Sequence, residues 1–333
     1  MRKLFVFLGI ALWAIGSVAS AQEVESMAPM QMSSWGDAKN DHIPEISLDM
    51  RGGYRIGSES SSGRFTGDDL NLDINGYISP KFSYSLNHRI ASSYYGEASW
   101  FDATNWLTLT YETENFAFTA GKDAIFVGSF EYDAYDLDTY YEMNSAFYND
   151  FDCWQWGVSA AWYPADDHEV LVQFANSPYA MDGGALALGW RGAWDWYESY
   201  WTANLWETDD DDVVKALNMG NRFNFGNFTL DLDLMGRFSE SYGGLTATLA
   251  PSYQFGEWGR VFLKAGADDT GDFDKLNIFF GGGFEYFPLK ENKDIRFHAA
   301  YTRNDYTVGH LFSIGLTWKM NLTKGIKKLI ERN

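Results

Sequence analysis

The segment from His310 to Met320 constrains the fold of this chain more than any other stretch. Its even-numbered positions carry mostly large apolar or aromatic side chains, and its odd-numbered positions carry mostly small or polar ones. Because successive side chains of a strand point to opposite faces, this pattern predicts a strand with one apolar and one polar face. We count sixteen such segments, joined by seven short turns and eight longer loops. The chain is therefore expected to be all-β, with its last strand pairing with its first to close a barrel.

The first 21 residues have the features of a signal peptide. Arg2 and Lys3 precede an apolar run, and Ala19-Ser20-Ala21 is a typical small-residue cleavage site. The run is shorter than the ~20 residues that a membrane-spanning helix needs. An exported chain without such helices can cross a bilayer only as a closed barrel. We expect a signal peptide (1–21), a periplasmic extension (22–43), a transmembrane barrel (44–320) and a basic periplasmic tail (321–333).

Alternation alone would also fit a secreted sandwich or lectin, but other features favour lipid on the apolar side. The segments have about ten residues, the length at which a tilted strand crosses a bilayer. Long and short connections alternate, as expected of an outer and a periplasmic rim. Charged side chains lie on the other face of the strands, where a water-filled lumen would accommodate them. These residues are Asp49, Arg51, Arg55, Asp73, Arg89, Asp231, Asp233, Lys264, Glu285 and Arg296.

Aromatic residues gather near the predicted strand ends, where amphipathic rings suit the headgroup region. The residues assigned to this belt are Tyr54, Trp106, Trp162, Tyr163, Trp258, Tyr301 and Trp318.

Composition excludes several other classes of protein. A net charge of −21 argues against a nucleic-acid partner, which would require clustered Lys and Arg. The single cysteine, Cys153, excludes an intramolecular disulfide. The five histidines show no metal-ligand spacing, so neither a metal nor a cofactor is expected. The acidic runs 209–212 and 268–274 could hold divalent cations, but solvated loops are the favoured interpretation. Gly281–Gly283 lies within a predicted strand and indicates bending or close packing.

Two segments resemble a known family. They are Asn105-Trp-Leu-Thr-Leu-Thr-Tyr, continuing to Phe116-Ala-Phe-Thr-Ala-Gly-Lys122, and Trp154-Gln-Trp-Gly-Val-Ser-Ala-Ala-Trp-Tyr-Pro164. The chain resembles the phosphate-selective porin O/P family of Gram-negative outer membranes, in particular its Bacteroidetes-type members. The resemblance implies a sixteen-stranded, trimeric barrel with a constriction loop folded into the lumen.

The long third loop, residues 124–151, takes the position of that constriction loop. It contains no Lys, Arg or His. Because carboxylates favour cations, the family's phosphate selectivity is in doubt for this chain. The candidate constriction residues are Glu131, Asp133, Tyr135, Asp136, Asp138, Tyr140 and Glu142. The candidate basic residues of the lumen are Arg51, Arg55, Arg89, Arg191, Arg222 and Arg296. These arginines could form a basic ladder that faces the acidic loop, or could pair with carboxylates of the barrel wall.

The sequence thus predicts an outer-membrane porin for passive diffusion of small hydrophilic solutes or ions, with no enzymatic activity. Its expected partners are outer-membrane lipid, lipopolysaccharide, the permeating solutes and two further copies of the chain. The alternatives are an outer-membrane barrel enzyme, such as a lipase or protease, and a plugged barrel that binds surface ligands or acts as an adhesin. No Ser/His/Asp arrangement stands out in the sequence, although such residues can be distant along a chain.

Overall fold

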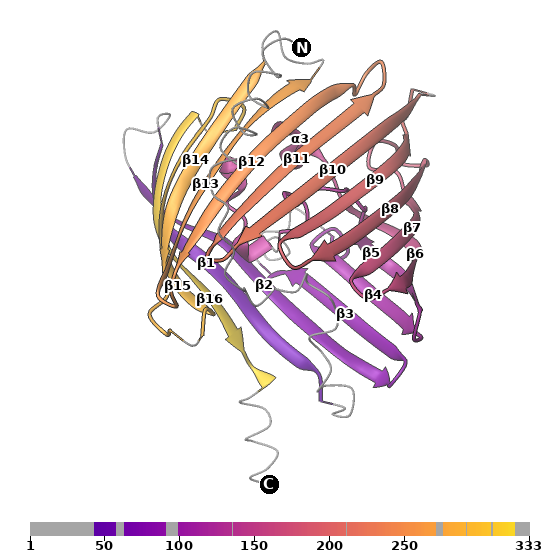
Figure 1. Ribbon diagram of the computed structural model, residues 1–333, viewed down its shortest axis with the longest axis horizontal. Helices are drawn as coiled ribbons and strands as arrows, with labels where there is room; N and C mark the ends of the chain where they lie inside the picture. The colour runs from indigo at the N-terminus through magenta and orange to yellow at the C-terminus, as the bar shows by residue number, and fades with distance from the viewer. Residues whose placement is uncertain are drawn as a thin grey trace.

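The computed structural model describes residues 43–57, 63–90, 99–134, 136–210, 212–270, 276–290, 292–307 and 309–323. Sixteen antiparallel strands, each paired with its neighbours in sequence, form a closed barrel (Figure 1). The predicted fold class and strand number are therefore confirmed. The predicted signal peptide, and nearly all of the predicted extension and basic tail, lie outside the described residues. Within the described part of the chain, no helix is long and apolar enough to cross a membrane.

The strands have the following bounds. The first eight are β1 (Glu45–Gly57), β2 (Arg64–Ser79), β3 (Phe82–Arg89), β4 (Thr104–Glu112), β5 (Phe116–Ala124), β6 (Trp154–Ala165), β7 (His168–Asn176) and β8 (Gly184–Trp194). The last eight are β9 (Tyr197–Glu207), β10 (Val213–Phe225), β11 (Phe228–Phe238), β12 (Gly244–Phe255), β13 (Gly259–Thr270), β14 (Asn277–Tyr286), β15 (Ile295–Asn304) and β16 (Gly309–Asn321). Two 3₁₀ turns, η3 (Asp136–Asp138) and η4 (Tyr141–Met143), and helix α3 (Ala146–Asp150) lie between β5 and β6.

The barrel closes where the first and last strands meet. Met50 of β1 lies opposite Trp318 of β16, and the register continues from Ser47↔Asn321 to Gly57↔Leu311. This pairing leaves no free sheet edge, which a barrel in lipid requires. The segment from His310 to Met320 therefore closes the sheet, as the sequence predicts.

The connections differ in length at the two rims. After the even-numbered strands β2 to β12 they have two or three residues, whereas after odd-numbered strands they have four or more. The two-residue β10–β11 turn contains Gly226 with φ of 67°, a backbone conformation that glycine adopts without strain. The β14–β15 connection is longer than the predicted short turn, with eight residues. The first strand, β1, begins at the short-turn rim, and the last strand, β16, ends at the same rim.

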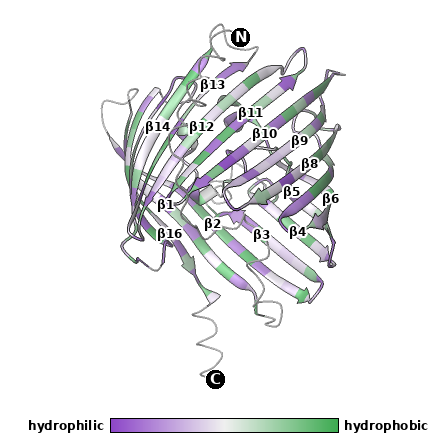
Figure 2. Ribbon diagram, in the orientation of Figure 1, coloured by the Kyte–Doolittle hydropathy of each residue, from purple (hydrophilic) through white to green (hydrophobic). Residues whose placement is uncertain are grey.

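The two faces of the barrel wall differ as the alternation predicts. Bands of hydrophilic and hydrophobic residues alternate along the strands (Figure 2). The exposed large side chains of the wall include Leu109, Phe118, Val158, Phe174 and Leu263, each next to polar residues that face inward. Exposed apolar side chains all round a barrel fit a lipid environment rather than water.

Two residues assigned to the aromatic belt face the other way. Trp106 lines the cavity inside the barrel, and Tyr163 packs against the buried cluster that includes Phe130. Trp106 precedes the exposed Leu107, and Tyr163 lies between the exposed Trp162 and Pro164, so position near a strand end was a weaker guide than parity. Of the other belt residues, Tyr54, Trp162, Trp258 and Tyr301 are exposed and Trp318 is partly exposed.

Candidate functional site

The connection between β5 and β6 folds inside the barrel, and we call residues 125–153 the inner loop. Its short helical segments lie within the ring of strands (Figure 1). The loop begins against neutral side chains of the wall. Gln173 of β7 accepts a hydrogen bond from Phe126 N at 2.9 Å and donates to Ala124 O at 2.8 Å. Thr202 of β9 accepts from Gly128 N at 2.8 Å. These side chains satisfy backbone groups at the end of β5 and at the start of the loop.

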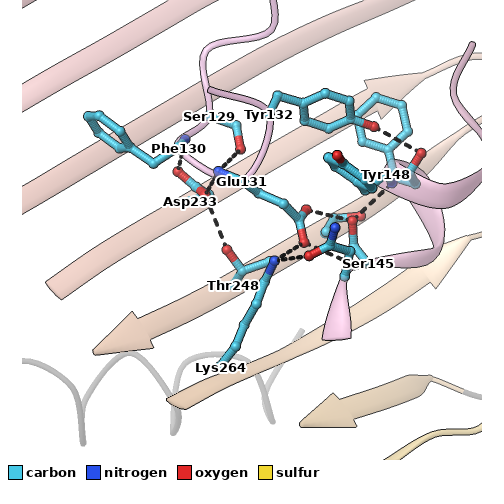
Figure 3. Close-up of polar contacts among 12 residues, drawn as sticks. Ser129, Phe130, Glu131, Tyr132, Ser145, Tyr148, Asp233, Thr248 and Lys264 are labelled. Carbon is cyan, nitrogen blue, oxygen red and sulfur yellow. Dashed lines mark hydrogen bonds and ion pairs between the residues drawn. The ribbon is translucent and has the colours of Figure 1, made fainter. Parts of the chain in front are cut away.

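Two buried carboxylates hold the centre of the inner loop (Figure 3). Asp233 of β11 accepts hydrogen bonds from the backbone N–H groups of Phe130 and Glu131, both at 2.9 Å. The Glu131 side chain accepts from Ser145 N at 2.9 Å and from Ser145 Oγ at 2.7 Å. Lys264 of β13 completes the arrangement, with its Nζ 2.6 Å from Glu131 Oε1. A buried carboxylate is stable only with such partners, so these contacts hold the loop in one position.

Helix α3 fixes the far end of the loop. Its N-cap Ser145 accepts from Tyr148 N at 3.0 Å, and Asp268 of β13 accepts from Ala146 N at 2.9 Å. Phe147 and Phe151 pack into a buried apolar cluster with wall residues. The wall residues of this cluster include Trp206, Val214, Ala216 and Met235. Asp268 was expected in a solvated acidic loop, but it is buried because β13 extends to Thr270.

Arginines from both sides of the barrel seam bind the loop backbone. Arg51 of β1 donates to the carbonyl oxygens of Leu137 and Thr139, and Arg296 of β15 also donates to Leu137 O. The Arg51 guanidinium lies 4.6 Å from the centre of the Tyr140 ring, within the range of a cation–π contact. Tyr140 Oη donates to the buried Glu285 of β14 at 2.9 Å. The loop is thus attached to β1, β14 and β15 as well as to β11 and β13.

Asp138 is the most exposed of the loop carboxylates whose ion pairs are described. Its side chain is 44% exposed, and Arg296 Nη2 lies 2.5 Å from Asp138 Oδ1. Enclosure inside the lumen acts to raise the pKa of this carboxyl group, but the positive charges of Arg296, Arg260 and Arg51 outweigh it. The pKa of Asp138 is therefore below its ordinary value of 3.8, and the group is ionised at neutral pH.

The predicted constriction residues do not form a single ring of free carboxylates. The Glu131 side chain is fully buried and is bonded to Lys264 and Ser145. Asp133 forms an ion pair with Arg191 at 2.8 Å, and Glu142 forms one with Arg55. Asp133, Asp138 and Tyr140 line the cavity described below. Tyr135 lies outside the described residues, as does the side chain of Asp136.

The predicted basic residues divide between the two roles considered from the sequence. Arg51, Arg55, Arg191 and Arg296 contact the inner loop directly. Arg222 instead pairs with Asp231 of the neighbouring strand, with contacts of 2.7 and 3.0 Å. Its guanidinium also lies 4.2 Å from the centre of the Phe130 ring.

Arg89 donates to Asp102 O at 2.9 Å in the β3–β4 connection, and so lies apart from the inner loop. The alternation predicts which face of the sheet a residue occupies but not its height along the barrel axis. The sequence therefore could not separate Arg89 from the other arginines.

The residues that anchor the loop could not be identified from the sequence. Asp233, Lys264 and Glu285 were assigned to the inner face, but nothing in the strand pattern indicated that the loop would bind them. Gly281, within the glycine triplet, faces Met143: a Cβ there would lie 2.8 Å from Met143 Cγ. The expected close packing is therefore confirmed, and it lets η4 approach β14.

Below the inner loop lies a cavity of about 1440 Å³. It reaches residues of the short-turn rim, including Asn227 and Asp294, and inner-loop residues from Phe130 to Asn144. Eleven carboxylate side chains line it: Glu45, Asp73, Asp123, Glu131, Asp133, Asp138, Glu198, Asp231, Asp233, Glu285 and Asp294. Six cationic side chains do so: Arg222, Arg260, Lys264, Lys293, Arg296 and Lys319. The cavity is therefore polar and predominantly acidic. No group of His, Cys, Asp and Glu with the arrangement of a metal site occurs among the residues that the structure describes.

A closed barrel with an apolar exterior, a charged interior and a long loop held inside its lumen defines a porin of the outer membrane. Comparison of the sequence with known families agrees. The model described as phosphate-selective porin O and P matches residues 57–195, which confirms the resemblance found in the two quoted segments. No curated protein matches the chain.

Solved structures support the fold. The chain is similar to a porin refined at 1.8 Å resolution, with a TM-score of 0.60 and 13% identity over 83% of this chain and 100% of that one. It is also similar to an anion-selective porin from Comamonas acidovorans, with a TM-score of 0.62 and 10% identity over 83% and 98% of the two chains. The trimer form of OmpT from Vibrio cholerae gives a TM-score of 0.57 with 11% identity, over 83% and 98%. The expected all-β barrel is the fold of these proteins.

Proposed function

We propose that this porin allows passive diffusion of small hydrophilic solutes and prefers cations to anions. The observation that carries the proposal is the charge of the cavity, where eleven carboxylates face six cationic groups. Four of these cations, Arg222, Arg260, Lys264 and Arg296, are already paired with carboxylates. The remaining acidic groups give the lumen a negative potential, which concentrates cations and repels anions.

Phosphate selectivity is not part of the proposal. A phosphate path would need Lys or Arg groups that are available to the solute. Of the six arginines considered for such a path, Arg51, Arg55, Arg191 and Arg296 are engaged by the inner loop and Arg222 by Asp231. Their charge therefore serves mainly to hold the loop.

We further propose that the inner loop constricts the channel and that the protein works as a homotrimer in contact with outer-membrane lipid and lipopolysaccharide. A trimer form among the similar porins supports the oligomeric state. The exposed aromatic and aliphatic residues of the wall support contact with lipid. We propose no enzymatic activity, since the family and the fold are those of channels.

Ion selectivity in planar bilayers tests this proposal. The mature protein, reconstituted between chambers of unequal KCl concentration, should open ohmic channels with a reversal potential of the sign expected for K⁺ preference. Complete absence of conductance would reject the porin function. Conductance with anion preference would instead reject only the selectivity. Labelling with a fluorophosphonate probe, which modifies active serine hydrolases, should give no signal and so test the enzyme alternative.

A further inference from the structure

The inner loop is attached to part of the lumen wall. Its described polar contacts run to β1, β7–β9, β11 and β13–β15. Residues of β9–β16 line the cavity, and so do inward-facing residues of β2–β5. The latter are Asp73, Asn75, Ser85, Trp106, Thr108, Thr110, Thr119 and Asp123. We call these eight residues the open wall.

The open wall carries hydroxyl, amide and carboxylate groups. Ser85 Oγ donates to Asn75 Oδ1 at 2.5 Å, and Thr110 and Thr119 are joined through their hydroxyl groups at 2.9 Å. Asn87 donates to Asp73 Oδ1 at 2.9 Å. The six cationic side chains that line the cavity come from β10, β13, β15, β16 and the β14–β15 connection. The open wall therefore offers hydrogen-bond partners without positive charge.

Trp106 is the one large aromatic residue of the open wall, and its orientation is fixed. Its indole N–H donates to Ser85 Oγ at 2.7 Å, and its ring centre lies 5.4 Å from that of Trp154. An indole at the border of an aqueous cavity forgoes the gain of burial, roughly 25 cal/mol for each Å² of apolar surface left in water. A solute with an apolar face would recover that gain. Sites that combine an aromatic surface with a few oriented polar groups are typical of ligand binding.

We propose that the open wall is a subsite for a small neutral saccharide, which lies with a C–H face against Trp106 and exchanges hydroxyl hydrogen bonds with Asn75, Thr108 and Asp73. A sugar presents both an apolar C–H face and a rim of hydroxyl groups, which matches this combination of side chains. Anionic solutes are disfavoured by Asp73 and Asp123, and simple cations have no need of the hydroxyl and amide groups. The inference rests on the proposed channel function and names a solute class for it.

The experiment measures the ion current of single reconstituted trimers while maltotriose is added. Binding in the lumen should cause reversible, saturable reduction of the current. Trp106→Ala should weaken the apparent affinity by roughly three- to tenfold, which is about 0.65–1.4 kcal/mol and within the range of one aromatic contact. Trp106→Phe, which keeps a ring but loses the N–H donor, should lie between Trp106→Ala and the wild type. If Trp106→Ala fails to assemble, Trp106→Leu serves in its place with the same expected loss.

Two controls separate binding from general blocking. A polyethylene glycol of similar size should reduce the current of the wild type and the Trp106 variants equally. Trp201→Leu, a change of an exposed aromatic on the outer face, should leave the maltotriose effect unchanged. Open channels with no saturable maltotriose effect in the wild type would overturn the subsite and leave the porin function standing. The same holds if Trp106→Ala or Trp106→Leu binds maltotriose as the wild type does. Absence of channels would reject both the saccharide subsite and the porin function.

Discussion

Lys264 and Glu131 form an ion pair inside the barrel, with 2.6 Å between Nζ and Oε1. The lysine belongs to β13 and the glutamate to the inner loop, so this contact joins the wall to the loop. The Glu131 carboxylate also accepts two hydrogen bonds from Ser145, and the lysine donates to Asn144 Oδ1 at 2.5 Å. The pair therefore fixes two separate points of the loop at one position on the wall.

Replacing Lys264 with Met should destabilise the folded barrel, because it leaves the Glu131 carboxylate buried without a counter-charge. Loss of one partner of a buried pair costs about 3–5 kcal/mol. The temperature at which the folded band disappears in semi-native electrophoresis should fall. Lys81→Met, in the exposed β2–β3 turn, is the matched control and should not change it. The double variant Lys264→Met/Glu131→Gln should recover part of the loss; equal temperatures for the single and double variants would contradict a buried pair.

Asp233→Asn should loosen the inner loop without changing the barrel wall. The amide has one acceptor oxygen in place of two, so one of the N–H groups of Phe130 and Glu131 loses its partner. An unsatisfied buried donor costs about 1–3 kcal/mol. We expect increased current noise in single-channel records and faster proteolysis between β5 and β6. Asp182→Asn, in the exposed β7–β8 connection, provides the comparison. Quiet channels and wild-type proteolysis for Asp233→Asn would mean that the contact does not hold the loop.

Neutralising Asp133 and Asp138 together to Asn should move the reversal potential toward anions. Both side chains line the cavity, and each change also releases the charge of its arginine partner, Arg191 or Arg296. Each change makes the net charge of the lumen more positive by one, and the arginine left without its partner carries that charge. Glu114→Gln, in the exposed β4–β5 turn, tests for a general effect of net charge. A reversal potential that matches the wild type would exclude the loop from the permeation path.

The contribution of Asp138 to selectivity should persist in mild acid. A carboxyl group whose pKa is lowered in the folded state keeps its charge, and its stabilising ion pair, until the pH falls through that lowered value. More than half of the difference in reversal potential between the wild type and Asp138→Asn at neutral pH should therefore remain at pH 3.8, the ordinary value for Asp. A difference that is already halved at pH 3.8 would show that Arg296 does not depress this pKa.

Much of the fold could be predicted because one physical rule governs each strand. Lipid on one side and water on the other impose strict alternation, and this assigned Asp73, Asp233 and Glu285 to the inner face. The same rule also places Trp106 opposite Leu107 and Leu109, so its position inside the barrel followed from parity. We instead placed it in the lipid-facing belt by its nearness to a strand end, and that interpretation was wrong.

The candidate site could be predicted only in outline. The absence of Lys, Arg and His marked the long loop as acidic, and its place after the fifth strand marked it as the inner loop. Which carboxylate is buried and which faces the solute depends on contacts between residues more than a hundred positions apart, such as Glu131 with Lys264. Periodicity within one strand carries no information on such pairs, since they are set by the height of each residue along the barrel axis.

The carbonyl oxygen of Leu137 accepts hydrogen bonds from Arg51 on the first strand and from Arg296 on the fifteenth. These two donors become neighbours only when β16 has paired with both β1 and β15. The double contact to Leu137 can therefore form only in the closed sheet, where it joins the two sides of that junction from within.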